Sequence, residues 1–198
     1  MASKAIERLI HLFSKFPGIG ARSSKRIVLH LIKNREYLMP SLANGLNDAM
    51  HTLCECKVCK NIDESDLCGI CVDAKRDKKM LCIVESLVDL WAIEDANFYK
   101  GLYHILGDIT PSMNDKNMQS TAIANLLERI EKYEISEVII ATNATLEGQT
   151  AAFLITEKLR PYSAIKVTRF AHGIPIGGEL KYLDEVTLST AFGARQVF

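Results

Sequence analysis

Four cysteines occur as two closely spaced pairs, a pattern typical of a metal site. Cys56 and Cys59 form one C-x-x-C pair, and Cys68 and Cys71 form a second pair after an interval of eight residues. Each pair presents two thiolates on one tight turn, and two pairs supply the four ligands of tetrahedral Zn²⁺. Because such a site leaves no ligand position open, we predict one structural Zn²⁺ per chain without a catalytic role.

Disulfide pairing and thiol redox chemistry are the competing uses of these cysteines. The chain begins Met-Ala-Ser-Lys, without a charged and then apolar signal peptide, which favours a reducing cytosol where disulfides are rare. A redox C-x-x-C motif normally occurs as a single pair. Of the two remaining cysteines, we expect Cys54 to be an unliganded neighbour and Cys82 to be a small buried hydrophobic residue.

A glycine turn followed by basic side chains is the second candidate site. Residues 17–20 read Pro-Gly-Ile-Gly, and three basic residues follow at once. The glycines allow positive φ and close approach, so that N–H groups at the start of the next helix can face a phosphate, where the helix dipole also favours anions. The pattern resembles the helix-hairpin-helix element and predicts sequence-independent DNA binding, with a plain interhelical turn as the alternative. The candidate contacts are Gly18, Gly20, Arg22, Lys25 and Arg26.

The charge distribution supports an anionic partner for this segment. The net charge of the chain is zero, but residues 1–35 hold eight basic residues and one acidic residue, a net charge of +7 that leaves −7 for the remainder. A basic arm on an acidic body indicates a local anionic partner rather than a generally adhesive protein. A solvated helix face is the alternative interpretation.

Acidic residues at the ends of predicted strands form the third candidate site. Glu85 follows the apolar run 80–84, at the strand end where parallel sheets carry their ligands. Residues 141–149 read Ala-Thr-Asn-Ala-Thr-Leu-Glu-Gly-Gln. Together these segments resemble the Toprim domain of primases and type IA topoisomerases. In its catalytic members, the second segment carries an Asp-x-Asp pair that holds Mg²⁺, followed by Glu-Gly-Glu.

This chain departs from the catalytic Toprim pattern at three positions. Asn143 and Thr145 replace the acidic pair, and Gln149 replaces the last acid, so that only Glu85 and Glu147 remain. Neutral side chains cannot replace two carboxylates on a hard cation that organises phosphoryl transfer. We therefore predict no strand cleavage, and a structural or weak Mg²⁺-binding role for the two acids. The P-loop pattern is also missing from the sequence, which predicts no ATP hydrolysis by the chain alone.

The elements that position these residues follow from the apolar spacing. Helical spacing predicts an N-terminal helix behind a Ser3 cap, a second helix through residues 27–32 and a third over residues 41–53. Short apolar runs then alternate with helical patterns, which predicts an α/β fold with a doubly wound, mostly parallel sheet. The expected strands are 80–84, 103–106, 138–141 and 165–170, and the expected helices are 88–96, 121–133 and 150–159.

Four segments follow from this layout. We predict a helix-hairpin-helix arm over 1–53, a four-cysteine zinc finger over 54–72, a Toprim domain over 79–171 and a C-terminal glycine-rich turn with a helix over 172–198. The last segment carries no basic residue among its glycines, so we interpret its turn as a connector. No apolar run approaches the length of a membrane span, and we expect no membrane partner.

Taken in order, these motifs resemble the RecR family of bacterial recombination mediators over essentially the whole chain. The resemblance implies a cytoplasmic, nucleoid-associated protein that acts with RecO and RecF to load RecA onto gaps of single-stranded DNA. It also implies homodimers and homotetramers that form ring-like clamps on DNA. The chain departs from the family pattern at residues 107–117, where Asp108 would add a third acid near Glu85 and leaves weak Mg²⁺ binding open.

Two functions from other classes remain open at this point. One is a small Toprim-type nuclease or primase-like enzyme, which the neutral residues Asn143 and Thr145 argue against. The other is a zinc-stabilised scaffold without a nucleic-acid role, which would lack the salt-sensitive DNA binding that the basic arm predicts.

Overall fold

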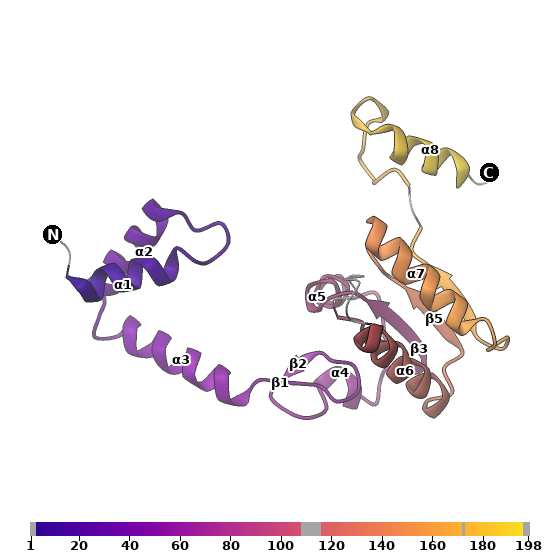
Figure 1. Cartoon of the computed structure of the whole chain (residues 1–198), viewed down its shortest axis with the longest axis horizontal. Helices are drawn as coiled ribbons and strands as arrows, with labels where there is room; N and C mark the ends of the chain where they lie inside the picture. Colours follow the sequence, from indigo (N-terminus) through magenta and orange to yellow (C-terminus); the bar gives the residue numbers. More distant parts are fainter. Residues whose placement is uncertain (1–2, 108–115, 172, 196–198) are drawn as a thin grey trace. The chain divides into compact units, whose positions relative to one another are not determined.

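The computed structural model describes residues 3–107, 116–171 and 173–195, which fall into two compact units (Figure 1). The first unit is residues 1–53 and the second is residues 54–198. Within the described residues, no helix has the length and apolar character needed to cross a membrane.

The N-terminal unit consists of three helices joined by short turns. They are α1 (Lys4–Phe13), α2 (Ala21–Lys33) and α3 (Leu38–Thr52). Ser3 caps α1 as predicted, because its hydroxyl oxygen accepts a hydrogen bond from the Ile6 amide. Helix α3 begins at Leu38, earlier than predicted, since Pro40 is tolerated in a first turn whose N–H groups lack helical partners.

The N-terminal unit buries few side chains. Helix α2 contributes Ser24, Val28 and Leu31 to the interior, whereas α1 and α3 contribute no fully buried residue. The amphipathic faces of α1 and α3 therefore remain partly open to solvent within one chain.

The second unit begins with the cysteine-containing segment. Two short antiparallel strands, β1 (Cys54–Glu55) and β2 (Ile62–Asp63), are followed by the short helix α4 (Gly69–Val72). We call residues 54–72 the finger. Its interior consists of cysteine side chains with Val58 and Ile70 packed against them, so it lacks a hydrophobic core of its own.

The body is a four-stranded parallel sheet between helices, which confirms the predicted α/β class (Figure 1). The strands follow the order β4-β3-β5-β6, and every neighbouring pair is parallel. The strands are β3 (Asp77–Val84), β4 (Gly101–Ile105), β5 (Glu137–Ile140) and β6 (Lys166–Arg169), and the helices are α5 (Leu87–Asp95), α6 (Lys116–Lys132) and α7 (Leu146–Leu159).

Strand β3 divides the core into two layers. Leu81 and Ile83 pack with residues of α6 and α7, whereas Cys82 and Val84 pack with Leu90 of α5 on the other face. This alternation follows from the two-residue period of a strand, and burial on both faces explains the continuous apolar run.

Helix α7 begins earlier than predicted, and the C-terminal segment contains a short helix in addition to the predicted one. Helix α7 begins at Leu146 instead of residue 150, because the Thr145 hydroxyl accepts a hydrogen bond from the Gly148 amide and caps the helix there. The C-terminal segment turns at Gly177, which has a φ of 84°, and continues through a 3₁₀ helix at Leu180–Tyr182 into helix α8 (Glu185–Gly193).

Candidate metal centre and nucleic-acid interface

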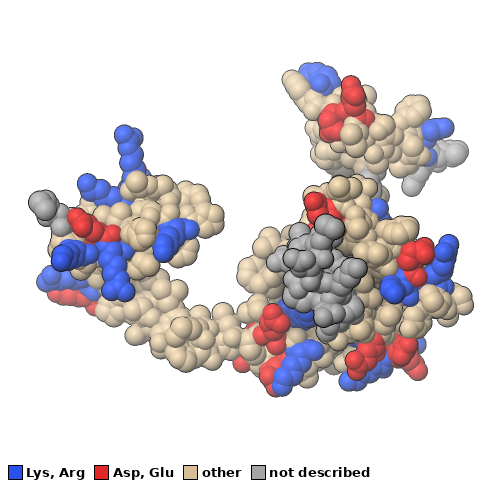
Figure 2. All heavy atoms as spheres, viewed as in Figure 1, with Lys and Arg blue, Asp and Glu red and all other residues tan. Residues whose placement is uncertain are grey.

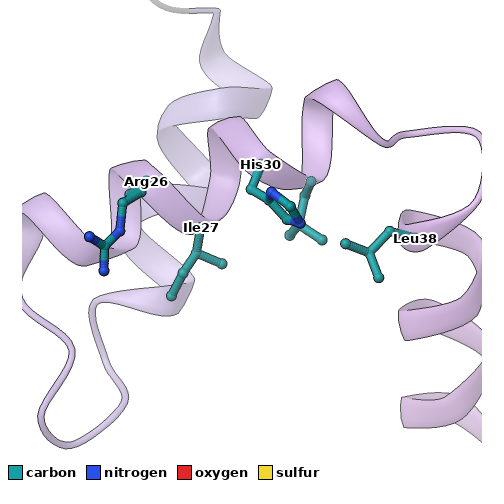
Figure 3. Close-up of a pocket in the computed structure, with 5 residues that line it drawn as sticks. Arg26, Ile27, His30 and Leu38 are labelled. Atoms are coloured by element: carbon teal, nitrogen blue, oxygen red, sulfur yellow. The ribbon is translucent and has the colours of Figure 1, made fainter.

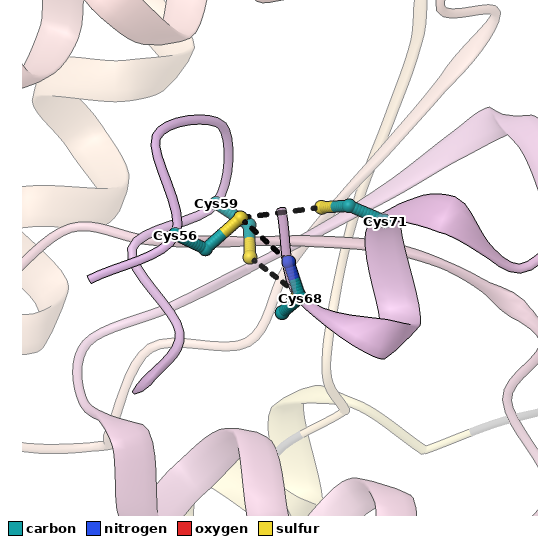
Figure 4. Close-up of side chains that lie close together, drawn as sticks. All are labelled: Cys56, Cys59, Cys68 and Cys71. Atoms are coloured by element: carbon teal, nitrogen blue, oxygen red, sulfur yellow. Dashed lines mark hydrogen bonds between the residues drawn. The ribbon is translucent and has the colours of Figure 1, made fainter. Parts of the chain in front are cut away.

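The four predicted cysteine ligands converge in the finger (Figure 4). Cys56 and Cys59 come from the loop between β1 and β2, and Cys68 and Cys71 come from the start of α4. Their sulfur atoms all lie within 4.8 Å of one another, and three of the four residues are buried. Among the described residues, this is the only group of three or more cysteine, histidine or acidic side chains close enough to hold one ion.

The sulfur separations fit a tetrahedral ion. The Sγ atoms of Cys59 and Cys68 are 3.4 Å apart, and those of Cys56 and Cys71 are 3.9 Å apart. Zn–S bonds of about 2.3 Å would set neighbouring sulfurs about 3.8 Å apart, so the cluster can accept a metal with little rearrangement. A four-sulfur donor set satisfies such an ion without water, which makes the site structural.

Backbone amides hold the thiolates in place. The Asn61 amide lies 3.4 Å from the Cys59 sulfur, and the Cys68 amide lies 3.4 Å from the Cys56 sulfur. Lys60 adopts a φ of 65°, which turns the chain tightly after the first pair. These contacts orient the two sulfurs toward the centre of the cluster, so the local backbone prepares a metal-binding site.

The two other cysteines lie outside this cluster. Cys54 lies in β1, where it is paired with Asp63 of β2. Cys82 is buried in the core on the α5 side of the sheet, where burial raises the pKa of its thiol to about 12. A thiol with so high a pKa is almost entirely protonated at neutral pH, which agrees with its predicted role as a small hydrophobic residue.

The finger is attached to the sheet by contacts that the sequence does not reveal. The Ile105 amide at the end of β4 donates a hydrogen bond of 3.0 Å to the Cys59 carbonyl. From α6, the Arg129 guanidinium lies 3.9 Å from the Cys71 sulfur through Nη2 and donates to the Tyr103 carbonyl through Nη1. The metal site is therefore continuous with the body.

The predicted phosphate-binding residues lie together at the start of α2. Arg22, Lys25 and Arg26 are all exposed, and their spacing places them on one side of the helix. None of them forms an ion pair with another described residue. Basic side chains stand out from the N-terminal unit in Figure 2.

The two glycines of the turn serve different purposes. Gly18 has a φ of 76°, a conformation that side-chain-bearing residues rarely adopt, as predicted for this turn. Gly20 has an ordinary φ of −81° and is the N-cap of α2, where it provides no side-chain hydrogen bond. A Cβ atom at Gly20 would meet nothing within 4 Å, so this end of the helix is open to an approaching group.

The basic face continues further along α2 than predicted. His30 and Lys33 are exposed and follow Arg26 at helical spacing. Arg26, Ile27 and His30 line a shallow hollow of about 390 Å³ that reaches Leu38 at the start of α3 (Figure 3). The signal was available in the sequence as an i, i+4, i+8 series beginning at Arg22.

The acidic edge of the sheet is organised by hydrogen bonds. The Glu85 carboxylate accepts the Asn143 backbone N–H through Oε1 and the Asn143 side-chain amide through Oε2, both at 2.8 Å. Gly148 packs closely beneath this pair, because a Cβ there would lie 2.5 Å from Glu85 Oε1 and 2.3 Å from the Asn143 carbonyl oxygen. Glu147 is exposed in the first turn of α7, and Asp108 lies outside the described residues.

Each of the three neutral residues that replace acids of the Toprim pattern has a hydrogen-bond partner. Asn143 binds Glu85, Thr145 caps α7, and the Gln149 side chain donates to the Ala144 carbonyl at 3.2 Å. At the positions where catalytic Toprim domains carry acids, the side chains of this chain therefore form hydrogen bonds with other residues of the same chain.

Comparisons with known proteins agree with this geometry. A RecR helix-hairpin-helix model matches residues 6–50, a Toprim domain model matches residues 79–171, and a RecR C-terminal model matches residues 173–196. The recombination protein RecR of Rickettsia bellii is 48% identical over 193 residues, covering 98% of this chain and 96% of that protein. The chain belongs to the RecR family.

Two other RecR relatives match over nearly their whole length. The recombination protein RecR of Novosphingobium aromaticivorans is 46% identical over 99% of this chain and 98% of its own length. That of Beijerinckia indica is 46% identical over 100% of this chain and 98% of its own length. These relatives are named as recombination proteins, although the chain also matches the Toprim domain model.

The first prediction concerns the metal centre of this RecR-family chain. Metal analysis of the purified protein should give one Zn²⁺ per chain, and Cys68→Ser should lose the ion and lower the melting temperature of the body. Structural zinc can contribute on the order of 10 kcal/mol to folding, so the loss should be severe.

Cys54→Ser is the matched control, because Cys54 lies in the same finger but outside the quartet. It should retain both the zinc and the melting temperature. Absence of zinc from the wild-type protein, or an unchanged Cys68→Ser variant, would contradict the assignment.

Proposed function

We propose that this chain is a DNA-binding mediator of recombinational repair. In this role it acts with RecO and RecF, in the bacterial cytoplasm at the nucleoid, to load RecA onto gaps of single-stranded DNA. Its RecR-family relatives and its helix-hairpin-helix unit support the proposal. The observation that carries it is the open, basic N-terminus of α2, which follows its N-cap Gly20 and presents three cations that have no ion-pair partner among the described residues.

The electrostatics of this helix end favour a phosphate. The first amides of a helix have no carbonyl partner within the helix and carry the positive end of its dipole. In α2 the N-cap supplies no hydrogen-bonding side chain, and the first turn contains no acidic residue. A phosphate oxygen bound here accepts hydrogen bonds from these amides, while Arg22 and Arg26 on adjacent turns neutralise the charge of the phosphate.

Such contacts position DNA without reading its sequence. Backbone amides and basic side chains that bind phosphates carry no base information, so one interface serves any gap in the chromosome. The acidic remainder of the chain, with a net charge of −7, would be repelled by the same DNA and is free to meet a basic partner protein such as RecO.

The second prediction tests the basic face. Replacing Arg22, Lys25 and Arg26 together with alanine should weaken DNA binding and flatten the dependence of log K on log salt concentration. The slope on duplex DNA should fall by roughly 0.9 for each lost phosphate contact. Binding is measured by fluorescence anisotropy of labelled oligonucleotides of unrelated sequence over a salt series.

A charge-matched control comes from the body. Replacing Lys75, Lys78 and Lys79 with alanine removes the same charge from exposed positions outside the N-terminal unit. This control should retain the wild-type slope. Wild-type affinity and slope in the Arg22, Lys25, Arg26 variant would favour the scaffold without a nucleic-acid role.

We further propose that the chain assembles into homodimers and homotetramers that encircle DNA. An apolar groove of about 690 Å³ opens between α1, α2 and α3 in the N-terminal unit. Its lining includes Phe16, which is 56% exposed, and Leu46, which is 64% exposed. A two-fold pairing of such faces would bury them and bring two basic α2 helices into one assembly.

The third prediction addresses this pairing. Leu46→Glu should convert the dimer to monomers, because it places a charge on a groove residue that is mostly exposed within one chain. Phe13→Glu should act in the same way from α1. Light scattering at tens of micromolar measures the mass, and DNA retention should fall together with assembly.

Leu29→Glu provides the control for mass, since Leu29 is similarly exposed on α2 but does not line the groove. It should leave the oligomer intact. A wild-type protein that remains monomeric at this concentration, even with DNA present, would rule out the clamp.

We also propose that the Toprim edge is structural and does not cleave DNA. The Glu85 carboxylate accepts two hydrogen bonds from Asn143, whereas in catalytic Toprim domains the corresponding acid would bind Mg²⁺. This supports the family assignment over the alternative of a small nuclease or primase-like enzyme.

The fourth prediction tests that edge. The purified protein should neither nick nor prime DNA with Mg²⁺ or Mn²⁺. Asn143→Asp should lose a hydrogen bond worth about 1 kcal/mol and face Glu85 with a like charge, lowering the melting temperature unless Mg²⁺ is added.

Asn143→Ala is the matched control, because it loses the same hydrogen bond without adding charge, and its melting temperature should not respond to Mg²⁺. If the wild-type protein nicks or primes DNA in the presence of metal, and if Glu85→Ala abolishes this activity, the chain is the alternative Toprim-type enzyme.

A further inference from the structure

Arg129 is a buried arginine that has no carboxylate partner within the described part of the chain. Its side chain projects from α6, the residue is only 4% exposed, and it takes part in none of the ion pairs among the described residues. Its contacts are the Tyr103 carbonyl at Nη1, the Cys71 sulfur 3.9 Å from Nη2, and the Tyr133 ring, whose centroid lies 5.9 Å from Cζ.

Burial of a guanidinium requires a compensating negative charge. A carbonyl oxygen and a ring face offer partial charges only, and an uncompensated buried charge strongly opposes folding. Among the described residues in contact with Arg129, the group that can carry a full negative charge at neutral pH is the Cys71 sulfur. Four thiolates around one divalent cation carry a net charge of −2. The positive charge of the Arg129 guanidinium compensates part of this excess.

We infer that Arg129 is the countercation of the metal centre and the positioning residue for Cys71. This inference rests on the proposed occupation of the cysteine quartet by zinc. The guanidinium fork joins the Tyr103 carbonyl of β4 to the Cys71 sulfur, so it fixes the direction from which the sulfur meets the ion. The chain thus places a cation on a ligand that lies 58 residues away in the sequence.

The position of Cys71 makes this contact consequential. Cys71 is the one member of the quartet that is not fully buried, so chelators and oxidants reach the metal centre from its side. A cation held beside a metal-bound sulfur compensates the excess negative charge of the centre and restrains that ligand from leaving the metal. Arg129 therefore stabilises the most exposed of the four ligands and slows the loss of zinc.

The test compares zinc release from the full-length zinc-loaded protein and three variants. Arg129→Gln and Arg129→Met remove the charge, and Arg129→Lys keeps the charge but loses the fork. Release into an excess of a colorimetric zinc chelator is followed over time. The neutral variants should release zinc about 10–100-fold faster, the range typical for lost partners of metal ligands, and Arg129→Lys should be intermediate.

A spectroscopic measurement separates positioning from general destabilisation. With Co²⁺ in place of zinc, the sulfur-to-cobalt charge-transfer bands should shift in the neutral variants, because one sulfur has lost its cationic partner. Lys132→Gln is the control, since Lys132 is exposed on the same helix. It should show the wild-type release rate and the wild-type bands.

The outcomes distinguish this inference from the zinc assignment itself. Wild-type protein without zinc would contradict the metal centre, whereas zinc-loaded variants with wild-type release rates and spectra would overturn the role of Arg129 alone. If the neutral variants fail to fold, Arg129→Lys decides the matter, because a single ammonium cannot keep both contacts. A wild-type release rate in that variant would also overturn the inference.

Discussion

The body is built around the central strand β3, whose second half is buried on both faces. β3 lies between β4 and β5, and the side chains of Leu81 to Val84 alternate between the two core layers. Each such side chain contributes about 1.5–3 kcal/mol by burial, so the sheet, both helix layers and the attached finger depend on this strand remaining apolar. The same strand delivers Glu85 to the carboxyl end of the sheet, where Asn143 meets it. The position of the polar edge is thus a by-product of hydrophobic packing.

The features that the sequence predicted are those set by local spacing. Two cysteine pairs, a glycine that requires positive φ at residue 18, and alternating strand and helix patterns each express a short-range rule, and the structure contains all three. The features that it could not predict join distant residues. The contacts of Arg129 with Cys71 and of Glu85 with Asn143 each span 58 positions. The pairing of β3 with β5 brings Glu85 close to Asn143, whereas Arg129 reaches Cys71 from helix α6. The sequence contains one indication that Arg129 is buried, namely its position next to the buried Ile130 on the apolar side of the helix.

The two compact units rely on different sources of stability. The body has two apolar core layers and a cysteine cluster, whereas the described residues of the N-terminal unit that are buried are only Ser24, Val28 and Leu31. A unit with so small an interior gains little from its own hydrophobic burial. Because the groove between its helices is open, the proposed DNA-binding surface would depend on association with further copies in the proposed assembly.

The bare start of α2 has a consequence for local dynamics. Four other helices begin with a side chain that caps them, namely Ser3, Ser86, Thr145 and Asp184. At Gly20 a serine or aspartate would add about a few tenths of a kcal/mol to helix stability, yet its oxygen would occupy the amides that the proposed phosphate needs. A bound phosphate would thus act as the missing cap of α2, so that DNA completes the secondary structure of the protein. In the unbound chain, the first turn of α2 would fray more readily, and its amides would exchange with solvent hydrogen faster than they do in the complex.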